Sequence, residues 1–135
     1  MCHLRKGNAN TKVTVECTVF TQVNFGRLTA KVLSAAPSNH LIGLYQIRLV
    51  DTLPLNKSKQ KVKGSYYPRN GGRKAEIVIA VQTVLEELPY LFRFLPCFPR
   101  YLFISTLLHE LGHHYATTKS GIKKYQQERF ADAYR

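Results

Sequence analysis

Hydrophobic and polar positions alternate along much of the first half of the chain. TKVTVECTVF (residues 11–20) and RLTAKVL (27–33) place β-branched or apolar residues at many alternate positions, which is typical of half-buried strands. LIGLYQIRLVDTL (41–53) is predicted to hold at least one more strand. In KVKGSYYPRNGGRKAEIVIAV (61–81), the turn residues 70–72 separate two β-prone runs and therefore predict a hairpin.

The hydrophobic pattern changes in the second half of the chain. VLEELPYLF (84–92) is typical of a short helix or a turn. Residues 88–108 are mostly apolar, but two arginines and three prolines interrupt them, so we expect a loop and a buried helix and no membrane-spanning segment. Pro99 suits the first turn of that helix, which we expect to continue towards Thr118 and to end at Gly121.

The second half of this predicted helix contains the sequence LLHELGHH (107–114). His109 and His113 are four residues apart, so their side chains lie on one face of a helix and can bind one metal ion. Glu110 follows the first histidine, where it can reach a metal-bound water. This is the HExxH arrangement.

A catalytic zinc ion takes three protein ligands and leaves one position for water, so a third donor is needed. In KKYQQERFADAYR (123–135), Glu128 and Asp132 share one face of a second short helix, joined to the first by a tight connection at 119–121. Glu128 is the candidate third ligand. Asp132 is expected to accept the other ring N–H of a ligand histidine and so fix its tautomer.

Other residues near the motif have simpler interpretations. HExxH alone occurs by chance in many helices, and the acidic pair strengthens it. His114 lies about a hundred degrees around the helix from His113, which favours a surface or packing role. Tyr115, Tyr125 and Tyr134 are candidates for a hydrogen bond to an oxyanion, although most tyrosines at such positions only pack.

Composition and charge set the frame for these motifs. The chain has 135 residues, 44% of them hydrophobic, with eight tyrosines and seven phenylalanines, which excludes a disordered protein and fits one domain over residues 1–135. Three separated cysteines (Cys2, Cys17 and Cys97) and no apolar leader predict a reducing, cytoplasmic setting. Cys97, between two prolines, is expected to be a small buried hydrophobe.

The net charge of +12 raises the question of anionic partners. Lys57, Lys59, Lys61 and Lys63 are spaced at period two, so in an extended segment all four would point from one face and could bind nucleic-acid phosphates. The alternative is that these lysines protect an edge strand from aggregation. No helix-turn-helix, zinc-finger or aromatic RNA-binding motif accompanies them in the sequence.

HELGHH followed by ERFAD resembles the gluzincin metallopeptidases, whose motif is HExxH on one helix and ExxxD on the next. The ExxAD form is similar to the HtpX-like and ImmA/IrrE-like branches, and the short linker of fourteen residues between His113 and Glu128 is similar to the minigluzincin group. Metzincins carry a glycine and a third histidine where Ala116 and Lys119 stand here, which argues against that branch. The resemblance covers residues 62–135.

The resemblance implies an α+β, small zincin-like domain in which a mixed twisted sheet has an edge strand beside the active-site helix and a short C-terminal glutamate helix. It implies one Zn²⁺ held by His109, His113 and Glu128, with Glu110 as general base and Asp132 as support. The second hairpin strand, 75–81, would be the sheet edge on which substrate lies.

The function we expect is that of a zinc-dependent endopeptidase that hydrolyses extended peptide or protein segments. One alternative is a regulatory or binding module that keeps zinc for stability and hydrolyses nothing. The other is a nucleic-acid-associated protein whose basic surface dominates. No membrane partner is expected, and the oligomeric state is left open.

Overall fold

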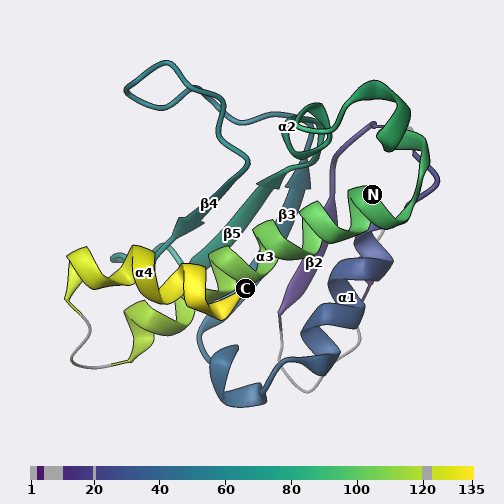
Figure 1. Ribbon diagram of the computed structural model, residues 1–135. Helices are drawn as coiled ribbons and strands as arrows, with labels where there is room; N and C mark the ends of the chain where they lie inside the picture. Colours follow the sequence, from purple (N-terminus) through teal and green to yellow (C-terminus); the bar gives the residue numbers. More distant parts are fainter. Residues whose placement is uncertain (1–2, 5–10, 20, 120–122) are drawn as a thin grey trace.

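One mixed sheet forms the centre of the protein (Figure 1). The computed structural model describes residues 3–4, 11–19, 21–119 and 123–135. Within these residues the strand order is β1-β2-β3-β5-β4; β2, β3 and β5 are parallel, and the two outer strands are antiparallel to their neighbours. The strands are β1 (His3–Leu4), β2 (Lys12–Val15), β3 (Leu44–Val50), β4 (Gly64–Tyr67) and β5 (Ala75–Ala80). The α+β class and the hairpin formed by β4 and β5 confirm the sequence prediction.

Helices cover one face of the sheet (Figure 1). The long helix α3 contacts β4, β5 and α1, and α4 packs along the second half of α3. The helices are α1 (Phe25–Ala35), α2 (Val81–Glu86), α3 (Cys97–Thr118) and α4 (Lys124–Tyr134), with short 3₁₀ helices η1 (Ser38–His40) and η2 (Tyr90–Phe94). Pro99 lies in the first turn of α3, as the sequence predicted, and the helix ends at Thr118. Gly121, which was expected to end it, lies outside the described residues.

The core lies between the sheet and this helical layer. Alternation along β3 buries Ile47 and Leu49 completely, while Arg48 stays half-buried on the opposite face, where it pairs with Glu16 and Glu76 at 3.1 and 3.3 Å. The buried helix side chains opposite β3 and β5 are Phe103, Leu107 and Leu111. Burial of such side chains is the main favourable term in folding, and here it holds α3 firmly against the sheet.

The predicted strand at 27–33 is wrong, because this segment belongs to α1. The Asn24 side chain caps the helix by accepting the Arg27 backbone N–H at 2.9 Å. The buried positions Phe25, Thr29 and Leu33 recur every four residues and form the face that packs into the core. Of the other predicted strand, 11–20, the structure describes 11–19, and within these residues only Lys12–Val15 is strand.

The edge of the sheet also differs from the expectation. Strand β5 was expected to be the edge, but it pairs with β3 on one side and β4 on the other. The edge strand on this side is β4, whose pairing in the described part of the chain is with β5. The strand at this edge of the sheet is therefore Gly64–Tyr67 and not Ala75–Ala80.

The segment that carries Lys57, Lys59, Lys61 and Lys63 is not one extended strand, so the condition for all four to point from one face is not met. Lys59 has a positive φ of 59°, and Asn56 exchanges backbone hydrogen bonds with Lys59 and Gln60, which makes 56–60 a tight turn. Lys61 forms an ion pair with Glu86, and Lys63 pairs with Glu87 at 2.9 Å. Alternation along an extended strand therefore does not place these four lysines on one face.

The apolar stretch 88–108 forms η2 and the first half of α3, as the sequence predicted. Cys97, expected to be buried, is exposed at the start of α3, because Pro99 and Phe103 take the core-facing positions of this turn. Over the residues that the structure describes, no helix combines the length and apolar character needed to cross a membrane.

Candidate metal centre

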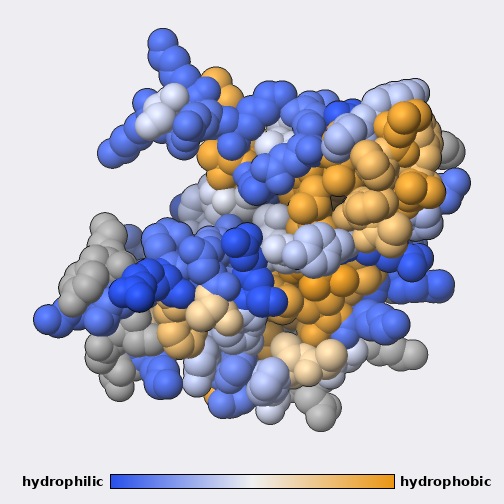
Figure 2. Space-filling view, viewed as in Figure 1, coloured by the Kyte–Doolittle hydropathy of each residue, from blue (hydrophilic) through white to orange (hydrophobic). Residues whose placement is uncertain are grey.

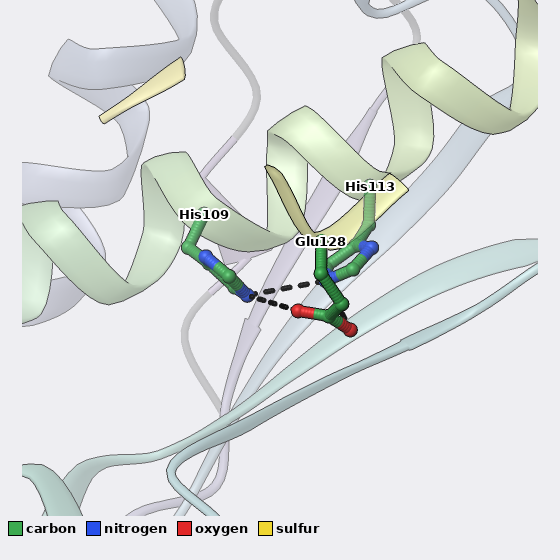
Figure 3. A group of neighbouring side chains, drawn as sticks. All are labelled: His109, His113 and Glu128. Carbon is green, nitrogen blue, oxygen red and sulfur yellow. Dashed lines mark hydrogen bonds and ion pairs between the residues drawn. The ribbon is translucent and has the colours of Figure 1, made fainter. Parts of the chain in front are cut away.

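The helices α3 and α4 bring His109, His113 and Glu128 together (Figure 3). The two Nε2 atoms lie 3.1 Å apart. The Glu128 carboxylate oxygens are 3.7 Å from the His109 Nε2 and 3.4 Å from the His113 Nε2. One ligand atom from each of the three residues can be chosen so that all lie within 4.8 Å of one another.

A close approach of the two helices makes this meeting possible. A Cβ atom added at Gly112 would lie 2.8 Å from the Ala131 Cα and 2.9 Å from the Tyr134 Cβ, so no larger residue fits without moving α4. Gly112 is on the turn of α3 between the two histidines, and Ala131 is one helical turn beyond Glu128. The contact therefore sets the distance from Glu128 to both imidazoles.

Asp132 lies on the far side of His109 from the other donors. Its Oδ1 is 3.1 Å from the His109 Nδ1, which is buried. The distance is that of a hydrogen bond, but the angles are not, so the buried Nδ1 has an ion-pair neighbour and no hydrogen-bond partner among the described residues. A carboxylate that accepted this N–H would keep the proton on Nδ1 and leave the Nε2 lone pair facing Glu128.

Glu110 is the most buried acidic side chain of the cluster, only 7% exposed. Burial, followed by the nearby negative charge of Glu128, raises the pKa of its carboxyl to about 7. The side chain lies against β4 at Gly64, where an added Cβ would come within 2.9 Å of the Glu110 Oε1. A side chain at position 64 would therefore displace this carboxyl.

The electrostatic environment also affects His109. Burial, followed by the neighbouring His113, lowers its pKa below the ordinary value for histidine. A neutral imidazole has a free lone pair, so this shift favours the form that a metal ion requires.

An open cleft of about 420 Å³ lies between β4, α3 and α4. His109, Glu110, His113 and Glu128 line it from the helices, and Gly64–Tyr66 line it from the edge strand. Gly64, Tyr66 and Gln127 also line the cleft and were not predicted from the sequence. The hairpin prediction was the available signal for the first two, but it placed the wrong strand at the edge.

His114 is fully buried and takes no part in the donor cluster. Its Nε2 is 3.0 Å from the Ile42 carbonyl oxygen, and its Nδ1 is 3.1 Å from the Tyr66 hydroxyl. Because a carbonyl can only accept, Nε2 carries the proton, and the Tyr66 hydroxyl donates to Nδ1. The packing role expected for His114 is thus a specific link between α3 and the edge strand.

Two of the three tyrosines considered for an oxyanion role lie away from the cleft. Tyr115 stacks on His40 with ring centroids 3.9 Å apart, and the Tyr134 hydroxyl is 2.6 Å from the His40 Nδ1. Neither residue lines the cleft. The side chain of Tyr125 lies outside the described part of the structure.

The donor set could hold a metal ion. Ligands about 2.0 to 2.1 Å from a tetrahedral ion are about 3.3 Å from one another. The two Nε2 atoms here are 3.1 Å apart, one Glu128 oxygen is 3.4 Å from His113 and the other is 3.7 Å from His109, and one ligand atom from each residue lies within 4.8 Å of the others. Two imidazoles and one carboxylate also leave a fourth position for water or substrate. Comparison with protein-family models, curated proteins and solved structures finds no match. The functional argument therefore rests on this geometry.

Proposed function

We propose that the protein is a zinc-dependent endopeptidase with a zincin-like fold. One observation carries the proposal: His109, His113 and Glu128 converge within 4.8 Å in a cleft that also holds the buried Glu110. A purely structural zinc site is closed by four protein ligands, whereas this cluster offers three. A buried carboxyl beside the open position is what a hydrolytic site needs and a structural site does not.

A zinc ion bound by these three residues would polarise a peptide carbonyl and lower the pKa of a coordinated water. Glu110 then accepts a proton from the attacking water and passes it to the leaving amine. Burial and Glu128 raise the pKa of this carboxyl to about 7 in the zinc-free chain, and a bound zinc ion would favour the ionised form that accepts a proton. Asp132, whose carboxylate is 3.1 Å from the His109 Nδ1, would hold that ring in the required tautomer by accepting its N–H.

The edge strand provides a place for the substrate. Strand β4 borders the cleft, and its side opposite β5 is the edge of the sheet. An extended peptide can add to such an edge through main-chain hydrogen bonds, which requires little of the peptide's own sequence. Gly64 brings this backbone directly beside Glu110. We therefore assign extended, unfolded segments as the substrate class.

The test compares Glu110→Gln with Glu87→Gln, an exposed glutamate of the same type away from the cleft. Each protein is reconstituted with zinc, its metal content is measured, and cleavage of a diverse fluorogenic peptide library is followed with a chelator control. Glu110→Gln should keep one zinc per chain and lose about 10²- to 10⁴-fold in rate, since the amide cannot accept the water proton. Glu87→Gln should behave as the wild type.

Two results would overturn the proposal. Equal cleavage by the wild type and Glu110→Gln would mean that Glu110 is not the base. Zinc bound at one ion per chain with no cleavage across the library would favour a zinc-stabilised binding module instead.

A further inference from the structure

A second feature lies at the opposite end of α3 from the histidines. Seven large hydrophobic side chains in η2, in the link that follows it and in the first turns of α3 are exposed. Figure 2 shows a hydrophobic area at the upper right, where this part of the chain lies in Figure 1. Leu91 and Tyr101 are 77% and 71% exposed, and the others are Tyr90, Phe92, Phe94, Leu95 and Phe98. We call these seven residues the apolar patch. Clusters of this kind on a soluble surface mark an interaction site.

The charged residues in the segment that carries the apolar patch are basic, although Glu86 lines a pocket together with Tyr90, Arg93 and Phe94. Residues 88–109 contain no aspartate or glutamate but do contain Arg93 and Arg100. Arg93 is half-buried and donates to the Leu88 and Glu86 carbonyl oxygens at 3.0 and 3.4 Å, so its cation is fixed at the base of η2. The two nearest acidic residues along the chain, Glu86 and Glu87, are paired with lysines.

A groove beside the apolar patch adds further cations. It has a volume of about 680 Å³ between α1 and α3, and Arg27, Lys31 and Arg100 stand around an apolar floor that includes Leu28 and Ile104. All three basic side chains are exposed. The surface next to the patch therefore combines positive charge with apolar lining.

This combination decides between occupants. A second copy of the chain seated on the patch would bring the same cations together, and like charges across an interface cost free energy. An anionic lipid surface offers the complementary arrangement, with phosphates for the cations and acyl chains for Leu91 and Phe94. Tyrosine rings, here Tyr90 and Tyr101, are enriched at the level of lipid headgroups.

We propose that the apolar patch and its flanking cations form a docking surface for an anionic membrane, on which the protein lies without crossing it. A membrane partner was not expected from the sequence, because the apolar stretch 88–108 is too interrupted to span a bilayer. The inference does not depend on zinc or on hydrolysis, and its test needs neither.

The chain contains no tryptophan, so a single introduced tryptophan reports on its own surroundings. Leu91→Trp is compared with Leu55→Trp, which replaces a leucine that is 56% exposed in a distant loop. Vesicles of phosphatidylcholine with or without phosphatidylserine are titrated at low salt. The fluorescence of Leu91→Trp should shift to shorter wavelength with the anionic vesicles, and that of Leu55→Trp should not.

Co-sedimentation with the same vesicles separates apolar insertion from general attraction to a basic protein. The double variant Leu91→Ser, Phe94→Ser keeps every charge, and its affinity for the vesicles should fall by about tenfold or more. Arg100→Gln should weaken binding about fivefold, whereas Arg69→Gln, an exposed arginine in the β4–β5 connection, should have a smaller effect. The replaced side chains are exposed, and thermal melts confirm that the variants fold.

Three outcomes would overturn the proposal. One is the absence of binding to anionic vesicles, and another is equal binding by the serine double variant. The third is a dimer in sedimentation velocity that the same two serines dissociate, which would make a second copy the occupant.

Discussion

The adjacent histidines His113 and His114 lie on two sides of α3 and have different surroundings. On the cleft side, His113 faces another imidazole and a carboxylate, and these donors converge on a common point. On the sheet side, His114 is fully buried, with one ring nitrogen near a carbonyl and the other near a hydroxyl. A rotation of about a hundred degrees around the helix axis separates a candidate ligand from a structural residue. The partners of each ring, not its residue type, determine its role.

The largest effect should come from the cleft side. His113→Ala removes one of three candidate ligands, so zinc affinity should fall by more than the roughly 100-fold upper limit for supporting residues. The free energy of unfolding of the zinc-free protein should change much less than the free energy of zinc binding, because the His113 ring is only partly buried and lies beside the cleft. Competition titrations with a zinc chelator, and thermal melts with and without zinc, measure both quantities. Unchanged zinc affinity would exclude His113 as a ligand.

On the sheet side the expected pattern is reversed. His114→Ala leaves a cavity and unpaired polar groups on Tyr66 and Ile42, which should cost about 2 to 5 kcal/mol of unfolding free energy. The folded fraction should still bind one zinc, since the donor cluster is not touched. Denaturant unfolding of the zinc-free protein measures the loss. If His114→Ala were as stable as the wild type, the two sides would not differ as described.

Asp132 tests how far the cleft-side cluster extends. Asp132→Asn should weaken zinc binding by about 10- to 100-fold, because a neutral amide is a poorer partner for the His109 Nδ1–H. Arg135 is 3.5 Å from the same carboxylate and competes for it, so Arg135→Ala should leave affinity unchanged or slightly higher. Calorimetric zinc titration compares the two. Equal losses in both variants would point to general damage to the end of α4.

The smallest effect concerns the aromatic contact beyond the cluster. Tyr134→Phe removes the hydroxyl that is 2.6 Å from the His40 Nδ1 and should cost about 1 kcal/mol of stability. Zinc affinity should fall by fivefold or less, since α4 keeps its packing against Gly112. Tyr101→Phe, at a position 71% exposed, is the matched control and should be neutral in zinc affinity. A loss above tenfold in Tyr134→Phe would give His40 a larger part in positioning α4.

The sequence predicted those features that depend on neighbouring residues. The helix with His109 and His113, the hairpin and the acidic pair on a second helix all follow from local spacing, and the structure contains each of them. The segment 27–33 was misread because Leu28, Ala30 and Val32 alternate while Thr29 and Leu33 also satisfy a helical spacing. The helix cap at Asn24 favours the helical pattern over the strand pattern, but Asn24 lies before the segment 27–33.

Features that depend on distant pairing could not be read in this way. Strand β5 is interior only because β3, from about 30 residues earlier, pairs along its other side. His114 is buried because Tyr66 and Ile42, 48 and 72 residues away, supply its two partners. The exposure of Cys97 likewise depends on which side of the first turn of α3 meets the core. None of these long-range contacts produces a hydrophobic pattern in the sequence around the residue concerned.

The close contact at Gly112 has a consequence for how the protein responds to its metal supply. Glu128 belongs to α4, so any zinc ion bound as proposed joins α4 to α3 through the same short span that Gly112 and Ala131 already close. Zinc binding and the packing of α4 against α3 are then thermodynamically linked. Each stabilises the other by the same free energy. At a zinc concentration 100 times the dissociation constant this amounts to about 2.7 kcal/mol for a form that binds only when docked. The packing of α4 on α3 would therefore be more stable when zinc is abundant, and α4 would separate from α3 more readily when zinc is scarce.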